Sequence, residues 1–205
     1  MTAGIEHGLR RLVPVLLAVA WLAGTGEAAA ADRSLLVQGG WLTGGDWKEA
    51  LDPTRGQTRD SYFVGLVGAH TWSRAWNARL SFEVEGAVIK HFGRQDHVEL
   101  TALPLAVRWH AFPWSRRVAT SVGLGGGFSY ATDEPDGERL VRDLDDDEDP
   151  EKLLFTWYAE VTAGPPAADW EGVFRLHHRS GGFGLLGEQG KTGSDFLTAG
   201  IRWRF

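Results

Sequence analysis

The chain has 205 residues, a net charge of −6 and no cysteine. This length fits one domain, and the absence of cysteine excludes a disulfide scaffold, a thiol nucleophile and a thiolate metal site. The negative charge, without a stripe of Lys and Arg, argues against nucleic acid as a partner.

The first 31 residues have the features of a secretory signal peptide. Two arginines precede an apolar run over 12–24, which is shorter than the ~20 residues that a membrane-spanning helix needs. Small residues at 29–31 then supply a site for signal peptidase. We therefore expect cleavage after Ala31, which leaves 32–205 as one exported domain; an uncleaved anchor helix is the alternative.

Segments in which apolar and polar side chains alternate recur along the rest of the chain, as in β-strands with two different faces. The clearest segment, 76–90, places its aromatic and aliphatic residues on one face and Arg79, Glu83 and Glu85 on the other. The expected strands cover residues 35–43, 60–72, 76–90, 97–110, 117–130, 152–163, 170–180 and 194–205.

Eight such strands predict an all-β fold, an antiparallel eight-stranded transmembrane β-barrel. The expected connections are long after the first, fifth and seventh strands and shorter after the second, fourth and sixth, which is typical of outer-membrane barrels. Several of the ten tryptophans, including Trp157, fall near expected strand ends, where they would form interfacial girdles. A soluble or sugar-binding barrel with buried aromatic residues is the alternative.

Alternation along the strands also predicts which polar side chains enter the barrel. We expect Arg79, Glu83, Glu85, Glu160 and Arg175 to point into the lumen and to pair there.

His178 and Ser180 lie two residues apart on the seventh expected strand, so both side chains point to one face. Their neighbours of the same parity are apolar, which puts this face toward lipid at the outer rim. Asp195 has the lipid-facing parity of the last strand, whereas His177 has the opposite parity and should enter the lumen. Polar residues facing lipid are costly and need a reason. A hydrolase whose substrate is a membrane lipid supplies one.

At these residues the chain resembles the lipid A 3-O-deacylase family, also called PagL-like or acyloxyacyl hydrolase outer-membrane proteins. The resemblance rests on His178-Arg179-Ser180 near the end of the penultimate strand, on Asp195 and on the exported barrel around them. It implies an eight-stranded barrel that removes the ester-linked acyl chain at position 3 of lipid A with a Ser-His-Glu triad, without a metal or other cofactor. Carried over, Ser180 is the nucleophile, His178 the general base and Asp195 the orienting acid.

Two residues depart from the family pattern. The acid is Asp195 rather than Glu, and Gly181 stands where the family has Asn, a candidate oxyanion donor. Backbone N–H groups of Gly181 and Gly182 are the replacement that we expect. Of the other carboxylates, Glu160 should face the lumen, and Glu188 lies in a glycine-bounded segment that would hold it loosely.

Three other features predict no separate site. The side chains of the neighbouring His177 and His178 diverge, which disfavours a metal site. The glycine run 123–127 opens no helix, so it is not a nucleotide loop, and small residues in a tightly curved strand explain it better. The acidic run 143–149 is most simply a solvated loop, with divalent cations bridging lipopolysaccharide phosphates as the lesser alternative.

The residues and the resemblance together predict an outer-membrane serine esterase of a Gram-negative bacterium. The resemblance implies lipid A of lipopolysaccharide in the outer leaflet, or a related acylated lipid, as its substrate. A noncatalytic structural or adhesive barrel and an outer-membrane phospholipase that uses the same residues are the alternatives. A homodimer is compatible with either an enzyme or a structural barrel.

Overall fold

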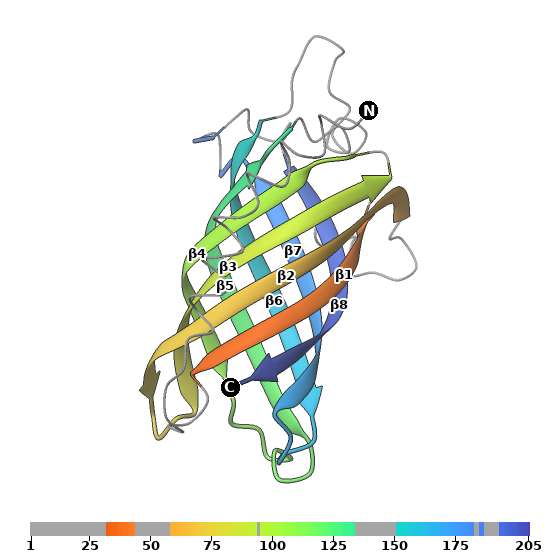
Figure 1. Ribbon diagram of the computed structural model, residues 1–205. Coiled ribbons are helices and arrows are strands. Elements are labelled where there is room, and N and C mark those ends of the chain that lie inside the picture. Colours follow the sequence, from red (N-terminus) through yellow and green to blue (C-terminus); the bar gives the residue numbers. More distant parts are fainter. Residues whose placement is uncertain (1–31, 44–57, 94, 134–150, 183–184, 187–192) are drawn as a thin grey trace.

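Eight antiparallel strands pair in chain order, and β1 closes the barrel by pairing with β8, as Figure 1 shows for the computed structural model. The predicted antiparallel eight-stranded barrel is thereby confirmed. The structure describes residues 32–43, 58–93, 95–133, 151–182, 185–186 and 193–205. The strands are β1 (Arg33–Thr43), β2 (Thr58–Ala75), β3 (Leu80–Gly93), β4 (Val98–Trp109), β5 (Ala119–Ala131), β6 (Leu153–Gly164), β7 (Trp170–Ser180) and β8 (Gly193–Arg204).

The predicted signal peptide over 1–31 and the acidic run over 143–149 lie outside the described residues. Within the described ranges, no helix has the length and apolar character needed to cross a membrane.

The largest error in the expected strand bounds concerns the start of the third strand. β2 continues to Ala75 and β3 begins at Leu80, because Trp76, Asn77 and Ala78 adopt φ angles of 50°, 55° and 62° and form a turn. Left-handed conformations at successive positions suit a tight turn between antiparallel strands. Arg79 is exposed at the end of this turn, so the prediction that it enters the lumen is wrong.

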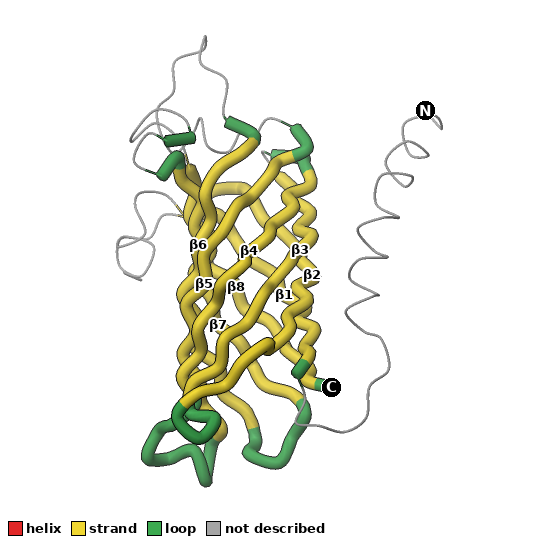
Figure 2. Tube along the Cα trace, turned by 90° about the vertical axis from the view of Figure 1, so that its left-hand side faces the viewer, coloured by secondary structure: helices red, strands yellow, loops and turns green. Residues whose placement is uncertain are grey.

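The two ends of the barrel differ. At one end of the barrel, β7 finishes at Ser180 and β8 starts at Gly193. We call this end the site rim. Short connections lie at the opposite end, close to the C-terminus (Figure 2). Large exposed aromatic residues gather on the strand ends and turns there, in keeping with an interfacial girdle. They are Trp72, Trp76, Trp114, Trp170 and Trp203.

The lumen holds a network of buried ion pairs. Glu160 accepts hydrogen bonds from Arg108, from Arg175 Nε at 2.8 Å and from Arg202 Nη1 at 2.7 Å. Arg108 also binds Glu83, and Arg175 binds Glu85 through both terminal nitrogens. The predicted inward orientation and pairing of Glu83, Glu85, Glu160 and Arg175 is confirmed. Each of these buried guanidinium groups thus lies beside at least one carboxylate, which compensates its charge.

Replacing Glu160 by Gln should destabilise the barrel by about 3 kcal/mol, because three buried guanidinium groups lose the carboxylate that they share. The loss is measured as a shift of the unfolding midpoint in urea, with the protein in detergent micelles. Glu151→Gln, at an exposed residue before β6, is the control and should change stability by less than about 0.5 kcal/mol. Equal stability of the two variants would contradict this reading of the network.

His97 lies in the connection between β3 and β4 and is buried in the lumen. Its ring stacks on that of His91 with the centroids 4.3 Å apart, and within the described part of the chain neither of its nitrogens has a hydrogen-bond partner. Burial lowers the pKa of His97 to about 3, with further contributions from His91 and Arg179. The folded barrel therefore holds this imidazole in its neutral form.

The stability of the barrel should fall as the pH is lowered from about 6.5 toward 3. The unfolded chain takes up a proton at His97 near pH 6.5 and the folded chain only near pH 3, so the unfolded state binds more protons within this window. His97→Gln should flatten this dependence, which urea titrations at pH 7.5 and pH 5 would measure. An unchanged pH dependence in the variant would show that His97 does not carry the effect.

Candidate active site

His178 on β7 lies directly opposite Asp195 on β8. Side chains of such cross-strand pairs meet on the same face of the sheet. His178 Nδ1 is 2.6 Å from Asp195 Oδ1, a hydrogen bond between an imidazole and a carboxylate. The two strands thus bring together a base and an acid that are 17 residues apart in the chain.

This pair lies on the outer face of the barrel wall. The alternate residues of β7 point into the lumen, where Arg175 binds Glu160, His177 binds Glu99 at 3.0 Å and Arg179 binds Ser129. His178 and Ser180 therefore point outward.

Trp157 covers the pair from the neighbouring strand. It lies opposite His178 on β6, and the two rings are 4.9 Å apart between centroids with an angle of 36° between their planes. His178 is 8% exposed and Asp195 is fully buried. Both side chains are therefore more buried than their expected position on the lipid-facing side of the wall indicates. Trp157, expected in an interfacial girdle, packs instead against the candidate base.

Two threonines fix the backbone at the pair. Thr156 on β6 donates to the carbonyl oxygen of His178 at 3.0 Å, and Thr43 on β1 donates to that of Asp195 at 2.9 Å. Sequence reasoning missed both threonines, because their role depends on which residues lie opposite one another in the barrel.

The second carboxylate oxygen of Asp195, Oδ2, is buried and has no hydrogen-bond partner among the residues that the structure describes. A buried carboxylate with one unpaired oxygen costs stability, which makes a purely structural role a poor explanation for it. The hydrogen bond to Oδ1 assigns the imidazole proton to Nδ1 and leaves Nε2 of His178 as an acceptor. That is the state in which a histidine takes a proton from a hydroxyl group.

Ser180 is the last residue of β7, two residues beyond His178 toward the site rim, and it is partly exposed. Within the part of the chain that the structure describes, its hydroxyl makes no hydrogen bond to His178. Such bonds are often long before substrate binds and tighten in the complex. The structure thus joins His178 to Asp195 and leaves Ser180 close to them along the strand on the same face.

Gly181 and Gly182 leave β7 in a turn beside the candidate nucleophile. Gly182 has φ of +59°, a Cβ there would overlap the ring of Phe155, and Leu186 N–H donates to the carbonyl oxygen of Gly181 at 2.8 Å. The chain can pass this close to β6 only without a side chain at Gly182. Glu188 lies outside the described residues.

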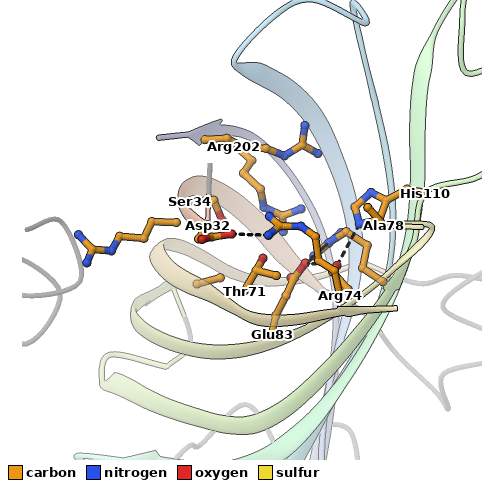
Figure 3. A pocket seen from close by; sticks show the side chains of 13 residues that line it. Asp32, Ser34, Thr71, Arg74, Ala78, Glu83, His110 and Arg202 are labelled. Carbon is orange, nitrogen blue, oxygen red and sulfur yellow. Dashed lines mark hydrogen bonds and ion pairs between the residues drawn. The ribbon is translucent and has the colours of Figure 1, made fainter. Parts of the chain in front are cut away.

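A polar pocket of about 230 Å³ opens at the opposite end of the lumen, where Arg74 pairs with Asp32 (Figure 3). It also holds a serine next to a histidine, since Ser81 Oγ lies 2.9 Å from His110 Nε2. The neighbouring carboxylate of Glu83 accepts from Ser81 rather than from the ring. Glu83 therefore does not orient the ring of His110 in the way that Asp195 orients the ring of His178. Among the described residues, no group of three or more His, Cys, Asp or Glu side chains could hold a metal ion.

The comparisons with known proteins show the fold. No protein-family profile matches the sequence, and no curated protein matches it significantly. Among solved structures, the chain is similar to the outer membrane enzyme PagL, with a TM-score of 0.57 and 11% identity over 83% of this chain and 99% of that one. It is also similar to Neisserial surface protein A, with a TM-score of 0.50 and 10% identity over 87% of this chain and all of that one. The N-terminal barrel of Pseudomonas aeruginosa OprF gives a TM-score of 0.45 and 8% identity over 85% of this chain and 98% of that one. The chain thus shares the eight-stranded fold of outer-membrane barrels.

Proposed function

We propose that this protein is an outer-membrane serine esterase of the PagL type, which removes an ester-linked acyl chain from lipid A in the outer leaflet. The observation that carries the proposal is the buried pair of His178 and Asp195 on the outer wall, which leaves Nε2 of His178 able to accept a proton. Ser180 follows on the same strand and face. Base, acid and nucleophile are the three groups that acyl transfer to serine needs.

In the proposed reaction, Ser180 Oγ attacks the ester carbonyl while Nε2 of His178 takes its proton. Asp195 accepts the Nδ1 hydrogen bond and stabilises the imidazolium that forms. The tetrahedral intermediate collapses to an acyl-serine, and His178 returns the proton to the departing alcohol oxygen. Water, deprotonated by His178, then attacks the acyl-serine; the bond between the acyl carbon and Ser180 Oγ breaks, the fatty acid leaves, and His178 returns the proton to Ser180 Oγ. Backbone N–H groups of Gly181 and Gly182 are the proposed donors to the oxyanion, and no cofactor takes part.

A lipid substrate explains why the pair faces outward. An esterase for a water-soluble substrate would gain nothing from placing its base on the wall of the barrel rather than in the lumen or a loop. Lipid A and phospholipids present their ester groups near the membrane surface. In an outer-membrane barrel, the site rim would lie at the depth of these ester groups.

A noncatalytic barrel is the competing function, since Neisserial surface protein A has a similar fold. The unpaired Oδ2 of the fully buried Asp195 favours the enzyme, because an inert barrel has no use for a costly buried carboxylate on its outer wall.

The proposal is tested with the purified barrel in detergent micelles, supplied separately with lipid A and with diacyl phospholipid. Release of fatty acid from lipid A supports it, and release only from phospholipid would favour the phospholipase alternative. A folded barrel that releases fatty acid from neither substrate would overturn the esterase assignment.

A further inference from the structure

The polar pocket of about 230 Å³ at the end of the lumen opposite the site rim takes no part in the proposed esterase reaction. Two sets of directly paired residues line it. Ser34 on β1 lies opposite Arg204 on β8, and Ser81 on β3 lies between Arg74 on β2 and Arg108 on β4. Side chains of such pairs lie on the same face of the sheet. The short serine side chains therefore leave open space between the long arginines.

Positive charge is in excess around this pocket. The side chains that line it include five arginines and two carboxylates among the described residues. Glu160 and Glu171 do not line it but bind three of these arginines. Arg175 also binds Glu160, and Glu85 compensates its charge. Five guanidinium groups thus share four carboxylates, and one positive charge remains among these side chains.

The pocket offers both buried and accessible hydrogen-bond donors. The side chains of Arg108 and Arg202 are 4% and 3% exposed, whereas those of Arg74 and Arg204 are 34% and 30% exposed. The hydroxyl group of Thr71 also borders the pocket (Figure 3). A small ligand can therefore enter beside the two exposed arginines and meet the two buried ones, where an opposite charge is attracted more strongly than at the surface.

We propose that the polar pocket binds a phosphate group, supplied either by free phosphate or by the headgroup of a glycerophospholipid. Guanidinium groups bind phosphate through pairs of parallel N–H···O hydrogen bonds. They reach the pocket from β2 and from β8, the strands on the two sides of β1. The tetrahedral oxygen atoms of a phosphate can accept from both directions, whereas the two oxygens of a carboxylate lie in one plane. Because the pocket lies at the other end of the barrel from Ser180, the proposal does not rest on the esterase function.

Isothermal titration calorimetry of the folded barrel, in a nonionic detergent and a phosphate-free buffer, tests the proposal. Inorganic phosphate, glycerol 3-phosphate and acetate are titrated separately. We expect saturable binding of a phosphate and much weaker binding of acetate, which carries less charge and fewer acceptor oxygens.

The first two ligands distinguish the sources of the phosphate group. Tighter binding of inorganic phosphate supports free phosphate as the ligand, and tighter binding of glycerol 3-phosphate supports a lipid headgroup. The absence of binding of both, or acetate binding as tight as that of phosphate, would overturn the proposal.

Arg204→Gln should weaken phosphate binding by about tenfold or more, because it removes a charged donor from the pocket. Arg116→Gln is the matched control. Arg116 is exposed in the connection between β4 and β5 at the same end of the barrel, and it does not line the pocket. Phosphate binding should change little in this variant. An equal loss in both variants would indicate a general attraction to this end of the barrel and would contradict a site in the pocket.

Arg74→Gln keeps the test valid if Arg204→Gln does not fold. About a third of the Arg74 side chain is exposed, so its replacement removes little packing. It also leaves the carboxylate of Asp32 without this ion pair at the pocket, which disfavours an anion further. We expect a loss of phosphate binding at least as large as in Arg204→Gln. Unchanged binding in the folded Arg74→Gln barrel would overturn the proposal.

Discussion

Replacing Ser180 by Ala should abolish deacylation, with turnover falling by on the order of 10³-fold or more. The variant loses the only atom that forms the acyl bond, while His178 and Asp195 keep their hydrogen bond. Stability should stay close to the wild type, because Ser180 is partly exposed at the end of β7 and its removal creates no cavity. Fatty-acid release and the heat-dependent gel mobility of the folded barrel measure the two effects.

His178→Ala should be about as damaging, and the double variant scarcely worse than either single one, since triad residues act as a unit. Ser73→Ala, on β2 near the opposite end of the barrel, is the matched serine control and should retain full activity. Wild-type turnover in Ser180→Ala would eliminate this nucleophile. Additive losses in the double variant would indicate that the two residues act independently.

Asp195→Asn should lower kcat by on the order of 10³-fold, with little change in KM. The carboxylate of Asp195 can only accept a hydrogen bond, and it accepts one from Nδ1 of His178. The amide group of an asparagine could instead donate a hydrogen bond to Nδ1. That donation would move the imidazole proton to Nε2 and block the atom that must accept the proton of Ser180. The loss therefore acts through the tautomer of His178 and not through the fold.

Asp195→Glu is the control for this mechanism, because it keeps a carboxylate in a fully buried position at the expense of one extra methylene. Its activity should lie well above that of Asp195→Asn. Equal activity of the two variants would indicate a packing role for Asp195, and wild-type activity in Asp195→Asn would exclude it from the site.

Side-chain alternation predicts the strands, the two faces and the polar lumen, because these depend on local order along the chain. It also predicts that His178, Ser180 and Asp195 share one face. Alternation cannot detect where a strand gives way to a turn, which is why Arg79 is misplaced: the turn before it depends on left-handed conformations at residues without a glycine.

Contacts across strands are harder to predict, since they depend on the register of the whole barrel. Trp157 covers His178 only because β6 and β7 pair at these two residues. The glycine run at 123–127 indicates close curvature, but only the register shows that Gly126 opens outward beside Trp157.

Mass spectrometry of lipid A shows directly whether Ser180 makes this barrel a deacylase. Lipid A is compared between cells that express equal amounts of folded wild type and Ser180→Ala. We predict that the wild type removes one ester-linked acyl chain from lipid A and that the variant leaves it intact. Unaltered lipid A in both strains would contradict the deacylase activity, and the same loss in both would contradict the role of Ser180.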